Sequence, residues 1–312
     1  MFTIKQPSRI IFGENSAQNF QYPKNSLVIT SKGAISRGWL DYLKIKDFLI
    51  YDQVEPNPSL ETVEKIHNEF KEKFSTVIGI GGGSSLDVAK FVGKKKKNMK
   101  ILIPTTFGSG SEVTRISVLK VDKKKCSFHD DGLFADIALI DPNFIKNTPL
   151  DIIKNSAIDA CAQCSEAYDS KISNAYTKFI CKKAFDILEK SIYDVKYENL
   201  AYGAMISGLG FGNSSTTLGH ALSYVFSNEG LSHGHALAFT TTVSHKFNNS
   251  IFYDRFLKLV KKLEFKKIFL NQNIEIASEI ILEDRKHLDN NPIAVNKNDI
   301  IKLLQNINNF SF

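Results

Sequence analysis

The sequence predicts an α/β domain built on a parallel sheet, followed by a mostly helical domain. In the first half, short apolar runs alternate with longer amphipathic stretches, as in strands that alternate with helices. After the Asp141-Pro142 break the pattern changes to long helices. With 312 residues, 43% of them hydrophobic, the chain can bury a sizeable core in each of two domains.

Four apolar runs predict the strands of the parallel sheet. They span residues 26–30, 48–51, 76–80 and 100–103. Between the second and third runs, residues 59–74 have apolar side chains at helical spacing, which predicts an amphipathic helix. These side chains are Leu60, Val63, Ile66 and Phe70. Two further β-like runs, at 116–121 and 137–140, precede the break.

A helix start opens the second half. Thr148-Pro149-Leu150-Asp151 has the order of an N-cap residue, a proline at the first helical position and an acidic first turn. Long helical patterns follow, and we expect the Gly- and Ser-rich stretch 208–215 to interrupt them. We therefore place the domain boundary near residues 143–148, between an α/β domain (1–145) and a helical domain (146–312).

The net charge of +7 does not by itself indicate nucleic acid. The lysines are spread along the chain without interleaved aromatic stacking platforms, so we expect no nucleic-acid partner. The one dense cluster, at residues 94–97, is expected to be a solvated loop. The positive charge still favours the approach of anionic substrates.

Cysteine usage predicts a reducing, cytoplasmic setting. Four cysteines are few for this length, and we expect no leader peptide before the first strand-like segment. No apolar run approaches the ~20 residues that span a bilayer, so we expect no membrane partner. Cys161 and Cys164 have the spacing of a redox pair or half a zinc site, but no second pair exists, and buried packing is favoured.

The strongest local signal is a glycine-rich turn between a predicted strand and a helix. It reads Ile78-Gly79-Ile80-Gly81-Gly82-Gly83-Ser84-Ser85-Leu86-Asp87-Val88-Ala89-Lys90. Glycines let the backbone approach a ligand, and free amides at a helix start favour a pyrophosphate. Ser84 and Asp87 have capping-box spacing. The pattern is not a GxGxxG, and a tight structural turn explains the glycines about as well.

A second loop, rich in hydroxyl groups and glycine, follows the next predicted strand. It reads Pro104-Thr105-Thr106-Phe107-Gly108-Ser109-Gly110-Ser111-Glu112. The carboxyl ends of parallel strands meet at one edge of a sheet, so both loops should face one crevice, where open α/β sheets bind ligands. The two loops together are far more specific than either alone.

Histidines are concentrated in the second half. Three of the seven, His220, His233 and His235, fall within sixteen residues. A lone histidine is more often structural, but this cluster together with Asp159 predicts a divalent-metal or proton-transfer site.

These three segments, in this order, resemble the iron-containing (group III) alcohol dehydrogenase family. The resemblance runs from about Arg9-Ile10-Ile11-Phe12-Gly13 to about Ala238, and it includes Glu55-Pro56-Asn57-Pro58. It implies a Rossmann-like dinucleotide-binding domain followed by an all-α metal- and substrate-binding domain, the dehydroquinate synthase-like fold. The implied activity is NAD(P)-dependent interconversion of an alcohol and an aldehyde by hydride transfer, in a homodimer or larger homo-oligomer.

The resemblance also implies the cofactor contacts. It places the pyrophosphate on three residues at the first loop, with further contacts from the residues that follow: Gly82, Gly83, Ser84, Asp87, Thr105, Thr106 and Ser109. Lys125 aligns near a nucleotide-contacting lysine. Ser31 stands where many relatives carry an acid that would repel a 2′-phosphate, so NADPH is acceptable beside NADH.

The implied metal site departs from the family pattern. Members usually bind one divalent ion through an aspartate, a histidine four residues later and two later histidines. Asp159 and His233 match, but Gln163 stands in place of the first histidine. Glutamine is a poor ligand beside imidazole, so affinity for Fe²⁺ or Zn²⁺ should fall, and the sequence leaves open whether a metal is bound.

The remaining ligand position falls on Thr216 or Thr217. His220 aligns with a nearby histidine of the nicotinamide cleft and can substitute as a ligand. Without a metal, His220 or His235 would have to donate the proton or hydrogen bond to the substrate.

Gln163, the His220-Ala221-Leu222-Ser223-Tyr224 segment and the later His233-Gly234-His235-Ala236 segment resemble the phosphonoacetaldehyde reductase branch of this family. That branch reduces phosphonoacetaldehyde to 2-hydroxyethylphosphonate. The chain ends soon after Phe310, so we also expect a shortened C-terminal helical domain. Two alternatives stay open: a dehydroquinate synthase-like lyase or synthase, and a degenerate dinucleotide-binding protein without catalysis.

Overall fold

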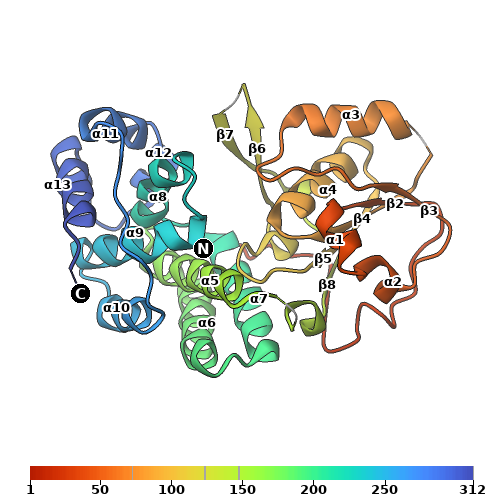
Figure 1. Cartoon of the computed structure of the whole chain (residues 1–312), viewed down its shortest axis with the longest axis horizontal. Helices are drawn as coiled ribbons and strands as arrows, with labels where there is room; N and C mark the ends of the chain where they lie inside the picture. The colour runs from red at the N-terminus through yellow and green to blue at the C-terminus, as the bar shows by residue number, and fades with distance from the viewer. Residues whose placement is uncertain (72, 123, 147, 312) are drawn as a thin grey trace.

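The computed structural model places an α/β half beside a helical half (Figure 1). It describes residues 1–71, 73–122, 124–146 and 148–311, with the backbone but not the side chain of Lys124. Part of the expected boundary at 143–148 therefore lies outside the described residues.

The α/β half is built on a parallel sheet. Within the described residues it has six strands in the order β1-β8-β5-β4-β2-β3. They are β1 (Arg9–Phe12), β2 (Ser26–Ile29), β3 (Phe48–Tyr51), β4 (Thr76–Gly81), β5 (Met99–Pro104) and β8 (Ile137–Ile140). The predicted strand at 116–121 is also present, as β6 (Ile116–Val121), but it forms an antiparallel hairpin with β7 (Lys124–His129).

The inner strands β2, β4, β5 and β8 are largely buried on both faces, because successive side chains alternate between two cores. Ile78 and Ile80 of β4 pack toward α2 (Trp39–Leu43). Val77 belongs to the other core, with residues of α3 (Leu60–Phe70) and α4 (Gly83–Lys96). A short helix, α1 (Lys32–Ser36), follows β2.

Helix α4 continues through residues 94–96, so the expectation of a loop there is wrong for these three lysines. Their cationic side chains lie in the last turn, where they interact favourably with the negative end of the helix dipole. Lys97 follows as the C-cap in a left-handed conformation.

The helical half begins with α5 (Leu150–Asp169), one residue later than predicted, with Pro149 at the N-cap position. The helices that follow are α6 (Ala175–Asp194), α7 (Tyr197–Ser214), α8 (Leu218–Asn228), α9 (His233–Phe247), α10 (Tyr253–Lys262), α11 (Ile274–Leu282), α12 (Arg285–Asn290) and α13 (Lys297–Asn308). Cys161 and Cys164 are buried and unpaired, which confirms their packing role. No described helix has the length and apolar character needed to cross a membrane.

The expected interruption at 208–215 is wrong, because α7 continues to Ser214. The glycines there serve close packing. A Cβ on Gly208 would lie 2.5 Å from Cγ2 of Val113, and a Cβ on Gly210 would overlap Sγ of Cys181. Small residues thus let α7 approach both α6 and the short 3₁₀ helix η1 (Ser111–Val113).

The loop after β5 meets the helical half directly. A Cβ on Gly108 would lie 2.6 Å from the backbone oxygen of Ser156 on α5, and Gly110 packs against Gly208 of α7. The loop after β4 lies beside it, because Gly81 and Pro104 are paired residues of adjacent strands. The carboxyl edge of the sheet therefore faces the helices.

Candidate active site between the two halves

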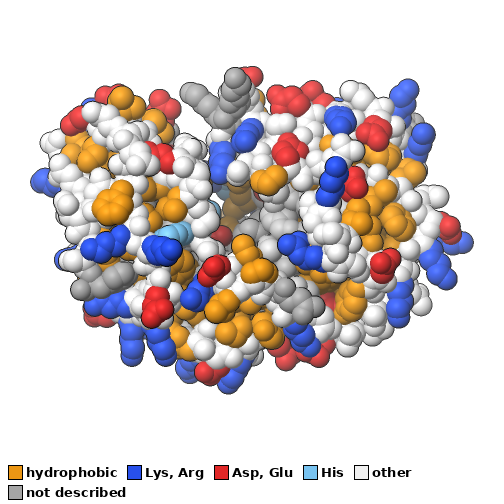
Figure 2. Space-filling view, viewed as in Figure 1, with side chains coloured by type: hydrophobic (Ala, Val, Ile, Leu, Met, Phe, Trp, Pro, Cys, Tyr) orange, Lys and Arg blue, Asp and Glu red, His pale blue; other side chains and the backbone are white. Residues whose placement is uncertain are grey.

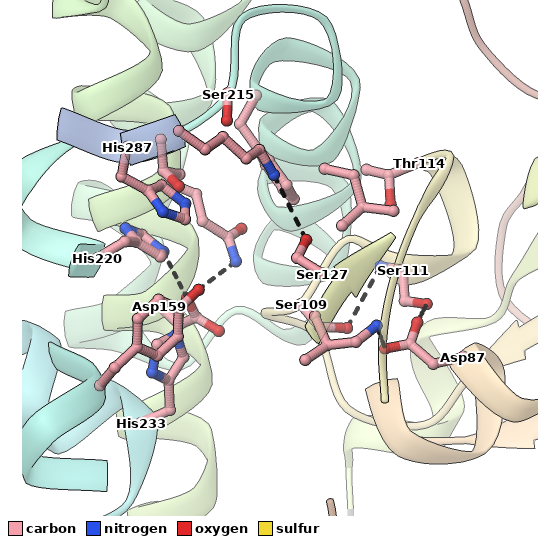
Figure 3. A pocket seen from close by; sticks show the side chains of 17 residues that line it. Asp87, Ser109, Ser111, Thr114, Ser127, Asp159, Ser215, His220, His233 and His287 are labelled. Carbon is pink, nitrogen blue, oxygen red and sulfur yellow. Dashed lines mark hydrogen bonds and ion pairs between the residues drawn. The ribbon is translucent and has the colours of Figure 1, made fainter. Parts of the chain in front are cut away.

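A cavity of about 180 Å³ opens where the carboxyl edge of the sheet faces the helices. Asp87, Ser109 and Ser111 line it from the α/β half, and Asp159 and His233 line it from the helical half, as Figure 3 shows. In the space-filling view the molecular surface is hollowed between the two halves (Figure 2). Residues from the two predicted loops and from the predicted histidine cluster thus share one cavity.

The start of α4 suits a phosphate group. Its N-cap residue is Gly82, and no side chain of the described chain caps its first amides. Those amides and the positive end of the helix dipole are therefore available to an anion. A Cβ on Gly83 would lie 3.1 Å from Oγ of Ser109, so glycine keeps the space between the two loops open.

Other predicted cofactor contacts lie near this helix start. The Thr105 hydroxyl is buried and has no hydrogen-bond partner among the described residues. Thr106 lies next to Gly82: a Cβ on Gly82 would be 3.0 Å from Oγ1 of Thr106. Ser31 follows β2, the strand beside β4, and bridges to Gln53. A buried hydroxyl without a partner and an uncapped helix start fit a dinucleotide at this edge.

Asp87 has protein partners instead of the expected capping role. Its carboxylate accepts hydrogen bonds from Oγ of Ser111 (2.6 Å) and the amide of Val118 (2.9 Å). It also lies 3.6 Å from the ammonium of Lys90, which is fully buried. The capping-box expectation for Ser84 and Asp87 is therefore wrong, and Asp87 ties the second loop to α4.

Lys125 lies on β7 as an exposed residue, and it is not among the residues that line the cavity. Its charge nevertheless contributes to lowering the pKa of His233, which lines the cavity, so its predicted contact with the nucleotide stays a prediction.

On the helical side, Asp159, His220 and His233 come together; we call them the Asp159 cluster. One ligand atom from each lies within 4.8 Å of the others. Oδ1 of Asp159 is 3.8 Å from Nε2 of His220 and 3.9 Å from Nε2 of His233. Bonds of about 2 Å in a tetrahedral site place ligand atoms about 3.3 Å apart, so a small inward movement would close the cluster on an ion.

Gln163 lies one helical turn after Asp159 and lines the same cavity. Its Nε2 donates to Oδ1 of Asp159 at 2.9 Å, whereas its Oε1 is buried without a hydrogen-bond partner among the described residues. A buried amide oxygen without a partner beside one carboxylate and two imidazoles is a further neutral donor. The residues present therefore fit a divalent ion.

Glu166, on the same face of α5, orients His220. Its Oε2 accepts from Nδ1 of His220 at 2.9 Å and from the amide of Thr217 at 2.7 Å. Nε2 of His220 is thereby left to face Asp159 and the cavity. A Cβ at position 219 would overlap the Glu166 carboxylate, so Gly219 is required for this approach.

The two imidazoles of the cluster differ in charge. Burial alone would lower the pKa of His220, but the Glu166 and Asp159 carboxylates together raise it to about 9. The protein packed around His233 lowers its pKa to about 4. His220 is therefore protonated at neutral pH, whereas His233 is neutral and offers a lone pair.

His235 does not reach the cavity, which corrects its expected catalytic role. Its Nε2 is 2.6 Å from the carbonyl oxygen of Lys266, and its ring packs against Phe265. Residues two apart on a helix point to nearly opposite sides, so His233 and His235 cannot both face the cluster. Thr216, by contrast, lines the cavity.

Sequence reasoning missed the C-terminal wall of the cavity. His287 of α12 lies parallel to His220, with ring centroids 6.3 Å apart, and its Nδ1 is 2.7 Å from Oδ2 of Asp284. Lys286 and Tyr224 also line the cavity. The Asp284–His287 pair is an i, i+3 spacing that could have been noticed, but nothing in the sequence places α12 beside α8.

Comparison with known proteins identifies the family. A family model described as iron-containing alcohol dehydrogenase matches residues 7–142, and the C-terminal model of the same family matches residues 153–281. The chain belongs to the iron-containing alcohol dehydrogenase family.

Individual relatives agree with this assignment. Long-chain-alcohol dehydrogenase 1 of Geobacillus thermodenitrificans is 32% identical over 237 residues, covering 64% of this chain and 60% of the relative. The 4-hydroxybutyrate dehydrogenase of Clostridium kluyveri is 32% identical over 209 residues, covering 57% of this chain and 56% of the relative. The match thus spans less than two thirds of either relative's length.

The fold agrees as well. The structure of sulfoacetaldehyde reductase from Bifidobacterium kashiwanohense in complex with NAD⁺ has a TM-score of 0.90 at 21% identity, with 100% of both chains covered. The α/β and helical halves therefore share the fold of that reductase.

Proposed function

We propose that the chain is an NAD(P)-dependent oxidoreductase that reduces a small aldehyde to its alcohol. The observation that carries the proposal is the shared cavity: residues of the two dinucleotide-type loops line one side, and the Asp159 cluster lines the other. A nicotinamide held by the first side would meet a carbonyl held by the second. Residues 1–145 would then bind the dinucleotide, and residues 146–312 would bind the substrate.

The chemistry divides between the cofactors and the chain. NAD(P)H supplies the hydride, and a divalent ion held by Asp159, His220 and His233 supplies Lewis-acid polarisation of the carbonyl when bound. In the metal-free protein His220 takes the polarising role. Held through Nδ1 by Glu166, it directs a protonated Nε2 into the cavity. It donates that proton to the carbonyl oxygen as the hydride adds to the carbon.

We further propose phosphonoacetaldehyde, reduced to 2-hydroxyethylphosphonate, as the substrate. A small cavity favours a short aldehyde. Two relatives are named for substrates with an anionic group, 4-hydroxybutyrate and sulfoacetaldehyde, which supports an anionic substrate here. The Gln163-containing ligand helix supports the same branch.

Steady-state oxidation of NADPH and NADH tests the proposal, with phosphonoacetaldehyde and a panel of neutral aldehydes as substrates. Protein stripped with EDTA is compared with protein given Fe²⁺ or Zn²⁺. Metal-restored activity supports the Asp159 cluster as the ligand set, and metal-independent activity supports His220 as the donor. Substrate turnover without net NAD(P)H oxidation would instead favour the lyase, and dinucleotide binding without any turnover would favour the degenerate binding protein.

A further inference from the structure

Lys286 is a cationic side chain in the wall of the active-site cavity. It extends from α12 and lines the 180 Å³ cavity together with Asp159 and His220. It also lines a second cavity of about 330 Å³, together with Arg115 and His129. Both cavities have Lys286 in their lining. A group that binds beside Lys286 in the smaller cavity therefore shares that cavity with the Asp159 cluster.

Lys286 forms no ion pair with a carboxylate among the described residues. Its ammonium contacts Nε2 of His129 and lies 3.4 Å from Oγ of Ser127, and neither group is negative. No carboxylate of the described residues lies within ion-pair distance of it.

The acidic residues nearby already have other partners. Asp284 is 2.7 Å from Nδ1 of His287, and Asp289 pairs with Arg285. Asp131 lies 2.8 Å from the guanidinium of Arg115. Rearrangement to neutralise Lys286 would break one of these contacts, so the positive charge remains available in the cavity.

The surroundings show the effect of this charge. Burial together with Lys286 and Arg115 lowers the pKa of His129 to about 4, so His129 is neutral and accepts from Lys286. Desolvation, opposed by Asp284 and reinforced by Arg115, lowers the pKa of Lys286 to about 8. The lysine is an exposed residue that is still mostly protonated at pH 7, and a positive charge without an ion-pair partner among the described residues favours an anion.

The lining around Lys286 suits a tetrahedral oxyanion. The hydroxyl-bearing residues Thr114, Ser127, Ser215 and Thr216 line the same cavity. An ammonium acts as a point charge and several hydroxyls can each meet a separate oxygen, whereas a planar carboxylate is better matched by the fork of an arginine.

We propose that Lys286, with the hydroxyls of Ser127 and Ser215, binds the phosphonate or sulfonate group of a short aldehyde whose carbonyl lies at the Asp159 cluster. We call this the Lys286 subsite. The inference rests on the proposed aldehyde reduction and adds the residue that selects the anionic substrate. It assigns to α12 a specificity role that Gln163 and the histidine segment do not provide.

The test compares Lys286→Met with Lys258→Met. Lys258 is an exposed residue of α10 outside both cavities, so its substitution changes the net charge equally. For each protein, kcat and KM are measured with phosphonoacetaldehyde, sulfoacetaldehyde and neutral propanal. Calorimetric titration with 2-hydroxyethylphosphonate and with NADPH measures binding without turnover.

Lys286→Met removes one charge-assisted contact, so its kcat/KM for phosphonoacetaldehyde should fall by about 10- to 100-fold, mainly through a higher KM. Lys258→Met should show no such fall. In Lys286→Met, affinity for 2-hydroxyethylphosphonate should fall similarly, while propanal and NADPH should change by less than about threefold. Equal losses for propanal and phosphonoacetaldehyde, or a matching loss of NADPH affinity, would overturn the subsite.

The same data separate the two proposals. If wild-type protein binds 2-hydroxyethylphosphonate through Lys286 but reduces no aldehyde, the subsite stands and the proposed reductase activity fails. If it reduces aldehydes and Lys286→Met changes neither phosphonate turnover nor phosphonate binding, the activity stands and the subsite fails.

Discussion

Glu112 should make the stability of the α/β half depend on pH. It lies in the short helix η1 at the end of the second loop, is 3% exposed, and interacts with the buried Lys90. Burial raises its pKa from 4.5 to about 7, although Lys90 opposes the shift. The folded protein therefore holds a proton that the unfolded chain releases at lower pH.

The sign follows from this difference in protonation. Stability is fully present below pH 4.5 and falls as the pH rises toward 7, by about 3 kcal/mol in all. Glu112→Gln keeps the shape and removes the titration. Its stability relative to wild type should therefore rise by about 2 to 3 kcal/mol between pH 5 and pH 8.

Denaturant unfolding at pH 5 and at pH 8 measures the stability difference between the variant and wild type. The fluorescence of Trp39 monitors the unfolding. Trp39 is the one tryptophan in the sequence and packs on Phe144 in the α/β half, so it reports the half that contains Glu112. Comparing variant with wild type cancels the titration of the groups that do not interact with Glu112. A difference that stays constant between the two pH values would refute the reasoning.

Three further substitutions probe the site and the fold. His233→Ala removes one donor of the Asp159 cluster, so turnover should fall by about 100-fold or more while dinucleotide affinity, measured by fluorescence titration, is retained; unchanged turnover would exclude His233. Gln163→His should raise Zn²⁺ affinity by about 10- to 100-fold in competition with a chromogenic chelator, and equal affinity would show that this side chain does not reach the ion. Gly208→Ala brings a Cβ to 2.5 Å from Val113 and should cost about 1 to 3 kcal/mol, seen as a lower Tm; an unchanged Tm would contradict the tight packing of α7.

Local patterns predicted much of the fold. Apolar runs located the strands β2, β3, β4, β5 and β8, because buried parallel strands are short and apolar throughout. The same rule could not tell that β6 leaves the sheet, since pairing with β7 or β8 depends on tertiary contacts. The glycines at 208–214 led to the wrong prediction of a helix interruption. Close packing of α7 outweighs the poor helix propensity of glycine there.

The candidate site was predictable where residues are close in sequence or match a family pattern. Asp159, His220 and His233 do come together, and Thr105 and Ser109 lie at the expected edge. His235 was misplaced because helical rotation separates it from His233. Lys286 and His287 were missed because their place in the cavity depends on how α12 packs against α8, which no local pattern encodes.

Transfer of deuterium from the cofactor tests the central claim most directly. NADPH and NADH with both C4 hydrogens of the nicotinamide replaced by deuterium are each incubated with the protein and phosphonoacetaldehyde, and the product is analysed by mass spectrometry. A cavity that holds the nicotinamide against a carbonyl at the Asp159 cluster predicts 2-hydroxyethylphosphonate with one deuterium on the carbon that bears the hydroxyl. An unlabelled product, or bound dinucleotide with no reduction of this or any neutral aldehyde, would contradict the account.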